Sequence, residues 1–136
     1  MTLPDSTYAA KAYGRVAQET LSPRDLEASL LLKAAAKLQA VLDGWEHKPP
    51  PALSDALLYN RRLWIVFIDA VLRDDNKLPL ATRQNVLNLG VFVMAETFSL
   101  MTAPKHVHAT NLIRINRAIA AGLGSKIGEN QPQRAA

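Results

Sequence analysis

Hydrophobic residues recur every three or four positions along most of the chain, which is the spacing of amphipathic helices. The pattern predicts five helices, over residues 6–20, 23–44, 53–73, 79–101 and 107–121. The fourth is apolar almost all round its middle, so we expect it to be central and mostly buried. A strand is the alternative over residues 86–94, where β-branched residues are frequent, but the length of the segment favours a helix.

Local signals mark the ends of the second segment. Ser22 can cap the helix, Pro23 suits its first position, and Asp25 completes a capping box. Gly44 is a natural C-terminal stop. The three consecutive prolines of residues 49–51 favour a stiff, extended loop before the next helix.

An Asn-Arg pair falls on the apolar side of a helix twice, at Asn60-Arg61 and at Asn116-Arg117. At about 100° per residue, charged residues form one narrow stripe along the third helix, and the first pair lies with the apolar residues opposite. The stripe consists of Asp55, Arg62, Asp69 and Arg73, and the apolar side of Leu57, Trp64, Phe67, Ile68 and Val71. A buried polar group without a partner costs about 1–3 kcal/mol, so these residues need partners.

Two interpretations of Asn60, Arg61 and Asn116 follow. Either they form a hydrogen-bonded network that fixes how the third and fifth helices pack, or they lie exposed in a groove and bind an inserted chain. Arg61 suits the second interpretation because its planar guanidinium binds carbonyls and carboxylates well. Trp64 and Phe67 fit a core position better than a partner contact.

Three further aromatic residues are candidates for partner contact. Phe92 lies on the more polar side of the fourth helix, where a partner or a neighbouring helix covers it. Tyr8 and Tyr13 lie on adjacent flanks of the first helix, which either packs on the bundle or acts as a removable strap over a partner groove. The full set of candidate partner-binding residues is Tyr8, Tyr13, Asn60, Arg61, Trp64, Phe92 and Asn116.

The composition is that of one folded domain. The chain has 136 residues, of which 49% are hydrophobic and 21% charged, enough for a sizeable core. It has no cysteine, which excludes disulfides, thiolate zinc sites and cysteine nucleophiles. The N-terminus lacks the order of a signal peptide, and the longest apolar run, residues 63–68, is far below the ~20 residues of a membrane span. We expect a cytoplasmic protein without membrane insertion.

Motifs for catalysis or metal binding are weak. His106 and His108 have no third ligand nearby, so we expect an exposed loop pair without metal. Asp74 and Asp75 are expected in a solvated turn, since a cation loop needs more oxygen ligands at regular spacing. The sequence has neither a glycine-rich phosphate loop nor a Gly-x-Ser-x-Gly motif. We therefore expect neither an enzyme nor a cofactor.

The net charge of +4 comes from the C-terminal part of the chain. Residues 1–96 contain 11 basic and 11 acidic side chains, whereas the rest contains five basic residues against Glu129. A nucleic-acid footprint gathers positive charge on one face or stripe. The alternative function is therefore RNA binding through Arg114, Arg117 and Lys126.

Several segments resemble, in their order and spacing, the FlaF family of bacterial flagellar biosynthesis regulators. They run from Tyr8 to Gly14, Ser22 to Glu27, Asn60 to Trp64, Leu78 to Arg83, Ile113 to Arg117 and Ala121 to Leu123. The likeness covers residues 8–123. The resemblance implies no catalytic residues in this chain. The candidate partner-binding residues are therefore chosen from their positions on the predicted helices.

The resemblance implies a small helical cytoplasmic protein that associates with flagellin and promotes its production and export. It also implies a second, FlbT-like regulator that acts on flagellin messenger RNA. We expect an all-α, five-helix bundle-like domain over residues 6–124 and a disordered C-terminal tail over residues 125–136. The predicted function is a flagellin-binding export chaperone and positive regulator of flagellin synthesis. The alternatives are a regulator that contacts flagellin messenger RNA through the basic C-terminal third, and a helical dimer that fills its own groove.

Overall fold

The structure, a computed structural model, describes residues 23–129, which contain four α-helices and no strand. The helices are α2 (Pro23–Asp43), α3 (Ala52–Leu72), α4 (Leu80–Thr102) and α5 (His106–Glu129). The all-α prediction is confirmed for this part of the chain, and residues 86–94 are helical. The predicted first helix, residues 6–20, lies outside the described residues, as do residues 130–136.

The C-terminal end of α2 follows the signal in the sequence. The described part of the helix starts at Pro23, and the predicted cap Ser22 lies outside the described residues. At the other end, the Gly44 amide donates to the carbonyls of Ala40 and Val41, both at 3.2 Å. These bonds satisfy carbonyls that the last turn of a helix otherwise leaves free.

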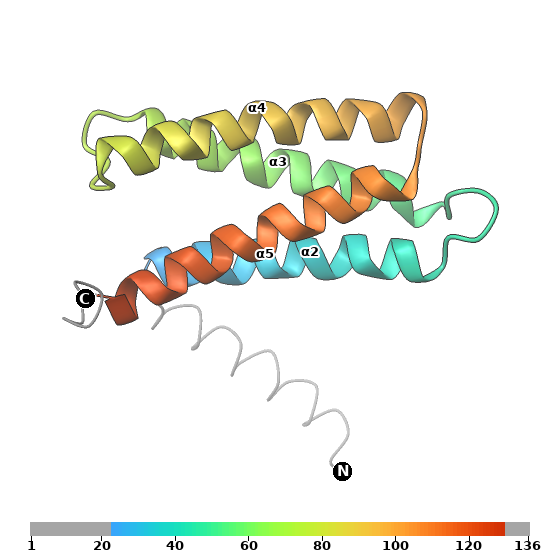
Figure 1. Cartoon of the computed structure of the whole chain (residues 1–136), viewed down its shortest axis with the longest axis horizontal. Coiled ribbons are helices and arrows are strands. Elements are labelled where there is room, and N and C mark those ends of the chain that lie inside the picture. Colours follow the sequence, from blue (N-terminus) through green and yellow to red (C-terminus); the bar gives the residue numbers. More distant parts are fainter. Residues whose placement is uncertain (1–22, 130–136) are drawn as a thin grey trace, which may run out of the picture.

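Two side chains hold the turn between α3 and α4. Asn76 Nδ2 donates to the Ala70 carbonyl at 3.0 Å. Arg83, from the first turn of α4, donates from Nε to the Val71 carbonyl at 3.0 Å and from Nη2 to the Arg73 carbonyl at 3.1 Å. These groups occupy carbonyls at the C-terminal end of α3. They fix the point at which the chain reverses, so α3 and α4 run antiparallel (Figure 1).

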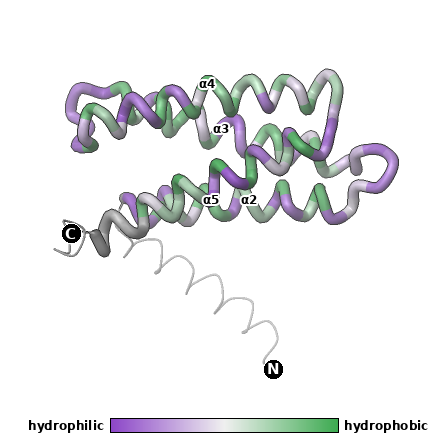
Figure 2. Tube along the Cα trace, in the orientation of Figure 1, coloured by the Kyte–Doolittle hydropathy of each residue, from purple (hydrophilic) through white to green (hydrophobic). Residues whose placement is uncertain are grey.

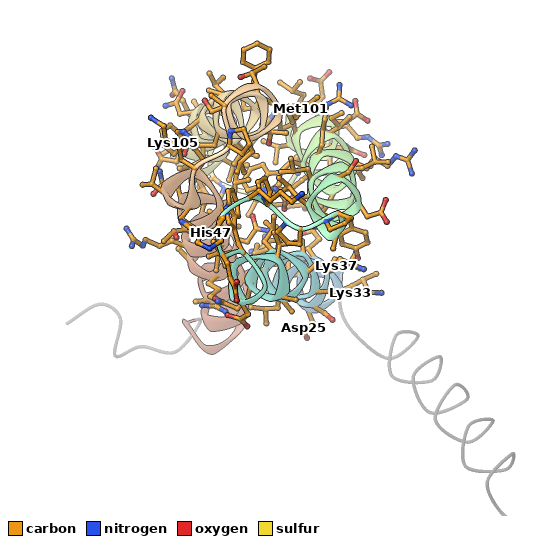
Figure 3. The ribbon with its side chains drawn as sticks, turned by 90° about the vertical axis from the view of Figure 1, so that its right-hand side faces the viewer. Asp25, Lys33, Lys37, His47, Met101 and Lys105 are labelled. Carbon is orange, nitrogen blue, oxygen red and sulfur yellow. The ribbon has the colours of Figure 1, made fainter. Side chains whose placement is uncertain are left out.

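The four helices form a bundle in which each packs against its neighbours in sequence and α5 closes the ring against α2 (Figure 1). Seen end on, they surround one shared interior (Figure 3). The largest fully buried side chains are Leu31, Leu38, Val41, Trp64, Val71, Val93, Leu100 and Leu112, together with Asn60 and Asn116.

Small residues allow two of the helix pairs to approach closely. The α2–α5 contact is the most extensive in the bundle, and Ala34 and Ala109 on these helices are completely buried. Between α3 and α4, a Cβ atom added at Gly90 would lie 2.6 Å from Ile68 Cδ1 and 3.0 Å from its Cγ1. Both distances are shorter than van der Waals contact, so the missing side chain at Gly90 is what lets Ile68 pack there.

Helix α5 is longer than predicted. The sequence pattern placed its end near residue 121, with Gly122 and Gly124 as a stop and a disordered tail from residue 125, but the helix continues to Glu129. A glycine in a helix interior costs only about 1 kcal/mol relative to alanine. Leu123 is buried and continues the inward side of the helix, so packing outweighs the propensity of the glycines.

The close approach at Gly90 generates a stability prediction. We expect Gly90→Val to lower the free energy of unfolding by about 1–3 kcal/mol, because the new side chain must displace Ile68, which is partly buried and packs against the core. Gly122→Val is the matched control: no atom lies within 4 Å of a Cβ at that position, so a change below about 0.5 kcal/mol is expected. Urea unfolding followed by circular dichroism measures both, and equal effects at the two positions would contradict the packing described.

Candidate protein-binding face

A hydrogen-bonded network of three side chains lies at the centre of the bundle. Asn116 Oδ1 accepts a hydrogen bond from Trp64 Nε1 at 2.9 Å, and Asn116 Nδ2 donates to Asn60 Oδ1 at 2.7 Å. The same Nδ2 lies 3.4 Å from the Leu31 carbonyl. All three side chains are fully buried. The network therefore joins α2, α3 and α5 through the interior.

This arrangement agrees with the packing interpretation of Asn60 and Asn116 and not with their exposure in a groove. Trp64 is also a core residue, since its ring packs edge-on against Phe67 with 5.5 Å between the ring centroids. Asn60, Trp64 and Asn116 are among the candidate partner-binding residues that the sequence predicts. The structure places all three in the interior, where none is available to a partner while the bundle stays closed.

Arg61 is exposed, so the prediction that it shares the buried side of α3 with Asn60 is wrong. One residue corresponds to a rotation of about 100°. That rotation carries the side chain from the centre of the buried side to its margin, where it lines a groove between α3 and α4. Within residues 23–129, the Arg61 guanidinium has no hydrogen-bond or ion-pair partner.

The groove between α3 and α4 has a volume of about 620 Å³. Its lining comprises Ser54, Leu57, Leu58 and Arg61 from α3, and Met94, Thr97, Phe98 and Met101 from α4. Apolar side chains dominate, and of the described residues Arg61 is the only charged one in the lining. The Thr97 hydroxyl already donates to the Val93 carbonyl at 2.7 Å. Arg61 and Ser54 therefore provide the polar groups that the groove can offer to another molecule.

Exposed apolar residues extend this groove along both helices. On α3 they recur every seven residues, or about two turns, so they share one side with the groove residue Leu58. On α4 they follow the groove residue Phe98 in the same way, and hydrophobic residues recur along the length of this helix (Figure 2). Figure 3 shows Met101 on the side of α4 that turns toward α3. The surface, here termed the α3/α4 face, consists of Leu58, Ile65, Leu72, Leu80, Val91, Phe98 and Met101.

The exposure of this face corrects the prediction that α4 is mostly buried. Its residues Leu80, Val91 and Phe98 are between 66% and 74% exposed. Among the described residues, α4 is also the one helix long and apolar enough to cross a membrane, although a third of the relevant window is buried. The helix is apolar on two sides, one toward the core and one toward solvent. So many apolar side chains together at a surface are typical of a site that binds another molecule.

The other predicted aromatic contacts lie elsewhere. Phe92 is exposed, but it is rotated by about 100° from Val91 and so lies off the α3/α4 face. Tyr8 and Tyr13 lie outside the described residues.

Two of the three basic residues of the RNA alternative lie close together on α5. Arg114 and Arg117 are exposed and line a hollow of about 390 Å³ against α2. The side chain of the third, Lys126, lies outside the part of the chain that the structure describes. Two arginines beside one hollow are fewer than the extended positive stripe that is typical of an RNA-binding surface.

His106 and His108 lie in the first turns of α5, not in a loop as predicted. The His106 ring packs against Trp45 with 4.5 Å between centroids, and its Nε2 lies 3.4 Å from the Trp45 carbonyl. His108 Nδ1 lies 3.1 Å from Glu96 Oε1, which also accepts a hydrogen bond from Asn111 Nδ2 at 2.8 Å. In the described part of the chain, no group of three or more His, Cys, Asp or Glu residues could hold a metal ion. The two histidines tie α5 to its neighbours.

Sequence reasoning missed all of the α3/α4 face. Periodicity assigned the apolar residues of α3 and α4 to the core without distinguishing the centre of the apolar side from its margin. The signal that could have found the face is the seven-residue repeat of Leu58, Ile65 and Leu72, which runs beside the inward line of Trp64 and Val71 and not along it.

The fold and this face define a small all-α protein with an apolar groove between two antiparallel helices that no residue within 23–129 covers. A groove of this kind suits an amphipathic helix of another protein. The family model for the flagellar protein FlaF matches residues 9–123, which is most of the chain. The chain therefore belongs to the FlaF family of flagellar proteins, as the resemblance in its sequence indicates. No curated protein and no solved structure matched it.

The central network predicts unequal effects of two similar substitutions. Asn116→Ala leaves both Trp64 Nε1 and Asn60 Oδ1 without partners, at about 1–3 kcal/mol for each buried group. Asn60→Ala removes an amide whose Nδ2 already lacks a partner, so its loss should be smaller. Urea unfolding measures the two values, with the exposed Asn88→Ala as control. Equal losses at positions 60 and 116 would show that Asn116 is not the centre of the network.

Glu27 generates a prediction about pH. It lies beside Phe67 and Ala70, and burial raises its pKa above the ordinary value of 4.5, an effect that Arg24 partly offsets. Because the folded pKa is the higher one, this group favours folding most at low pH, and that contribution declines as pH rises from 4.5 through the raised pKa. Glu27→Gln should therefore unfold at higher urea concentration than the natural protein above this window. The exposed Glu46→Gln controls for the loss of one negative charge, and a matching gain in that variant would contradict the prediction.

Proposed function

We propose that this protein is a flagellin-binding export chaperone and positive regulator of flagellin synthesis that acts in the cytoplasm. It works by binding alone, without a catalytic step or cofactor. Two findings support the proposal: membership of the FlaF family supplies the flagellar context, and the α3/α4 face supplies a surface on which a protein helix can dock. The face is the observation that carries the argument.

The dimensions of the face suit a helical cargo. Helix α3 has 21 residues and therefore spans about 30 Å, the length of a helix of about 20 residues. Unassembled flagellin exposes amphipathic terminal helices that pair only in the filament. Such a helix would lie in the groove with apolar anchors at positions i, i+3, i+4 and i+7. Covering it prevents premature polymerisation and leaves the cargo weakly structured for export.

The number of exposed apolar residues is sufficient for such a complex. Association costs at least about 4 kcal/mol in lost translational and rotational freedom, and the contacts in the complex must offset this cost. Complete burial of a Val, Leu or Phe side chain contributes about 1.5–3 kcal/mol. Seven partly to largely exposed anchors offset this cost, whereas a single exposed side chain would not.

The regulatory part of the proposal follows from the resemblance. A bound flagellin monomer links the chaperone to flagellin supply, and the FlbT-like regulator acts on flagellin messenger RNA in the same process. The α3/α4 face is then the surface through which the protein senses and protects its cargo.

Binding to monomeric flagellin tests the proposal, with two matched valine variants. Val91 on the α3/α4 face is 72% exposed, and Val66 on the side of α3 toward α2 is 66% exposed. We expect the natural protein and Val66→Asp to bind flagellin equally in isothermal titration calorimetry. Val91→Asp should weaken binding by about tenfold or more, because a carboxylate is then buried among apolar groups.

The outcomes separate this function from the alternatives. No complex between folded protein and folded monomeric flagellin would refute the chaperone proposal. Binding of flagellin messenger RNA, with affinity that falls steeply with salt and is lost on replacing Arg114 and Arg117 by alanine, would favour the RNA alternative. An apolar contact with flagellin should depend much less on salt.

A further inference from the structure

Among the described residues, Arg61 is the one charged residue in the lining of a mostly apolar groove. A partner that covers the groove also covers this guanidinium. Burying it unpaired would cost several kcal/mol through lost hydration, which would cancel the gain from several apolar anchors. The occupant of the groove must therefore supply acceptor groups to Arg61.

No acidic group of the described chain does so. Helix α4 contains a single acidic residue, Glu96, and this carboxylate is held by His108 and Asn111 on the side of α4 toward α5. The aspartates of α3 belong to the polar stripe outside the groove, and no ion pair joins them to Arg61. No residue within 23–129 therefore neutralises the guanidinium, which can bind a ligand group.

We infer that the helix that docks in this groove carries a carboxylate on the margin of its apolar side, and that this carboxylate pairs with Arg61. The inference rests on the proposed function and deepens it by naming the chemistry of the cargo segment. Arg61 thus acts as the residue that selects among amphipathic helices. The fork of its guanidinium donates two parallel hydrogen bonds to a carboxylate, which fixes the register of the bound helix against the apolar anchors.

The charge argument also disfavours a second copy of this chain as the occupant. In a symmetric pair, the same lining residues meet each other. That lining contains Arg61 but no carboxylate, so two copies would bring two arginines into an apolar interface without a counter-charge. A cargo helix with an acidic residue does not have this difficulty.

Synthetic amphipathic helices of about 20 residues test the inference directly. Three probes share one leucine side and differ at one position on its margin, which is Glu, Gln or Lys. We expect the natural protein to bind the Glu probe about tenfold more tightly than the Gln probe, as measured by fluorescence anisotropy. In Arg61→Glu the preference should move to the Lys probe, which a general loss of folding cannot produce.

Arg62→Glu is the matched control, because Arg62 is the adjacent exposed residue and lies outside the groove lining. It should retain the preference of the natural protein for the Glu probe. With monomeric flagellin, Arg61→Glu should weaken binding by about tenfold and Arg62→Glu by less than about twofold. Circular dichroism confirms that both variants are folded.

The results distinguish the failure of this inference from the failure of the proposed function. If flagellin binds and Val91→Asp weakens it, but Arg61→Glu changes neither flagellin nor probe affinity, the role of Arg61 is overturned and the chaperone proposal stands. If flagellin does not bind, but the Glu probe is preferred and this preference depends on Arg61, flagellin is not the cargo. The pairing of Arg61 with a carboxylate is then still supported. A dimer in sedimentation experiments that Val91→Asp dissociates, or binding to phosphatidylglycerol vesicles that Arg61→Glu abolishes, would overturn the acidic helix as occupant.

Discussion

The hydrogen bonds of the Asn116 side chain hold together three of the four described helices. Its amide faces Trp64 and Asn60 on α3 and the Leu31 carbonyl on α2, with no water-exposed route to satisfy any of these groups. Apolar contacts between helices tolerate sliding and rotation, because one methyl group replaces another at little cost. A buried amide does not, because a small shift leaves a donor or acceptor unpaired. The network therefore fixes the rotation of α3 about its own axis.

That rotation decides what α3 presents to solvent. With Asn60 and Trp64 pointing to the centre, the line of Leu58, Ile65 and Leu72 falls on the margin beside α4 and remains exposed. The close approach at Gly90 then brings α4 alongside, so its own outer apolar side continues the same surface. The exposure of the α3/α4 face is thus a consequence of the rotation of α3 that the Asn116 hydrogen bonds fix. Arg61 lies on that margin for the same reason.

A protein with this arrangement has a stable interior and a separate apolar surface, and the two have different roles. The interior contains the residues that first suggested partner binding, and it contributes them to stability. The surface contains residues that resemble ordinary core positions in the sequence, and it is the part suited to take up another chain. Such a separation lets the bundle stay folded whether or not another molecule covers the surface.

The sequence by itself determined the four helical segments that the structure describes, the stop of α2 at Gly44 and the presence of buried polar groups at Asn60 and Asn116. These features depend on residues close together in the chain or on helical periodicity. Only the tertiary structure decided that Arg61 is exposed, that α5 continues through its glycines, and that the described residues leave one side of α3 and α4 uncovered. The physical reason is that periodicity identifies an apolar sector of a helix, but the width of that sector exceeds the width covered by its neighbours. Which part remains open depends on the rotation set by contacts between residues more than 50 positions apart, such as Trp64 with Asn116.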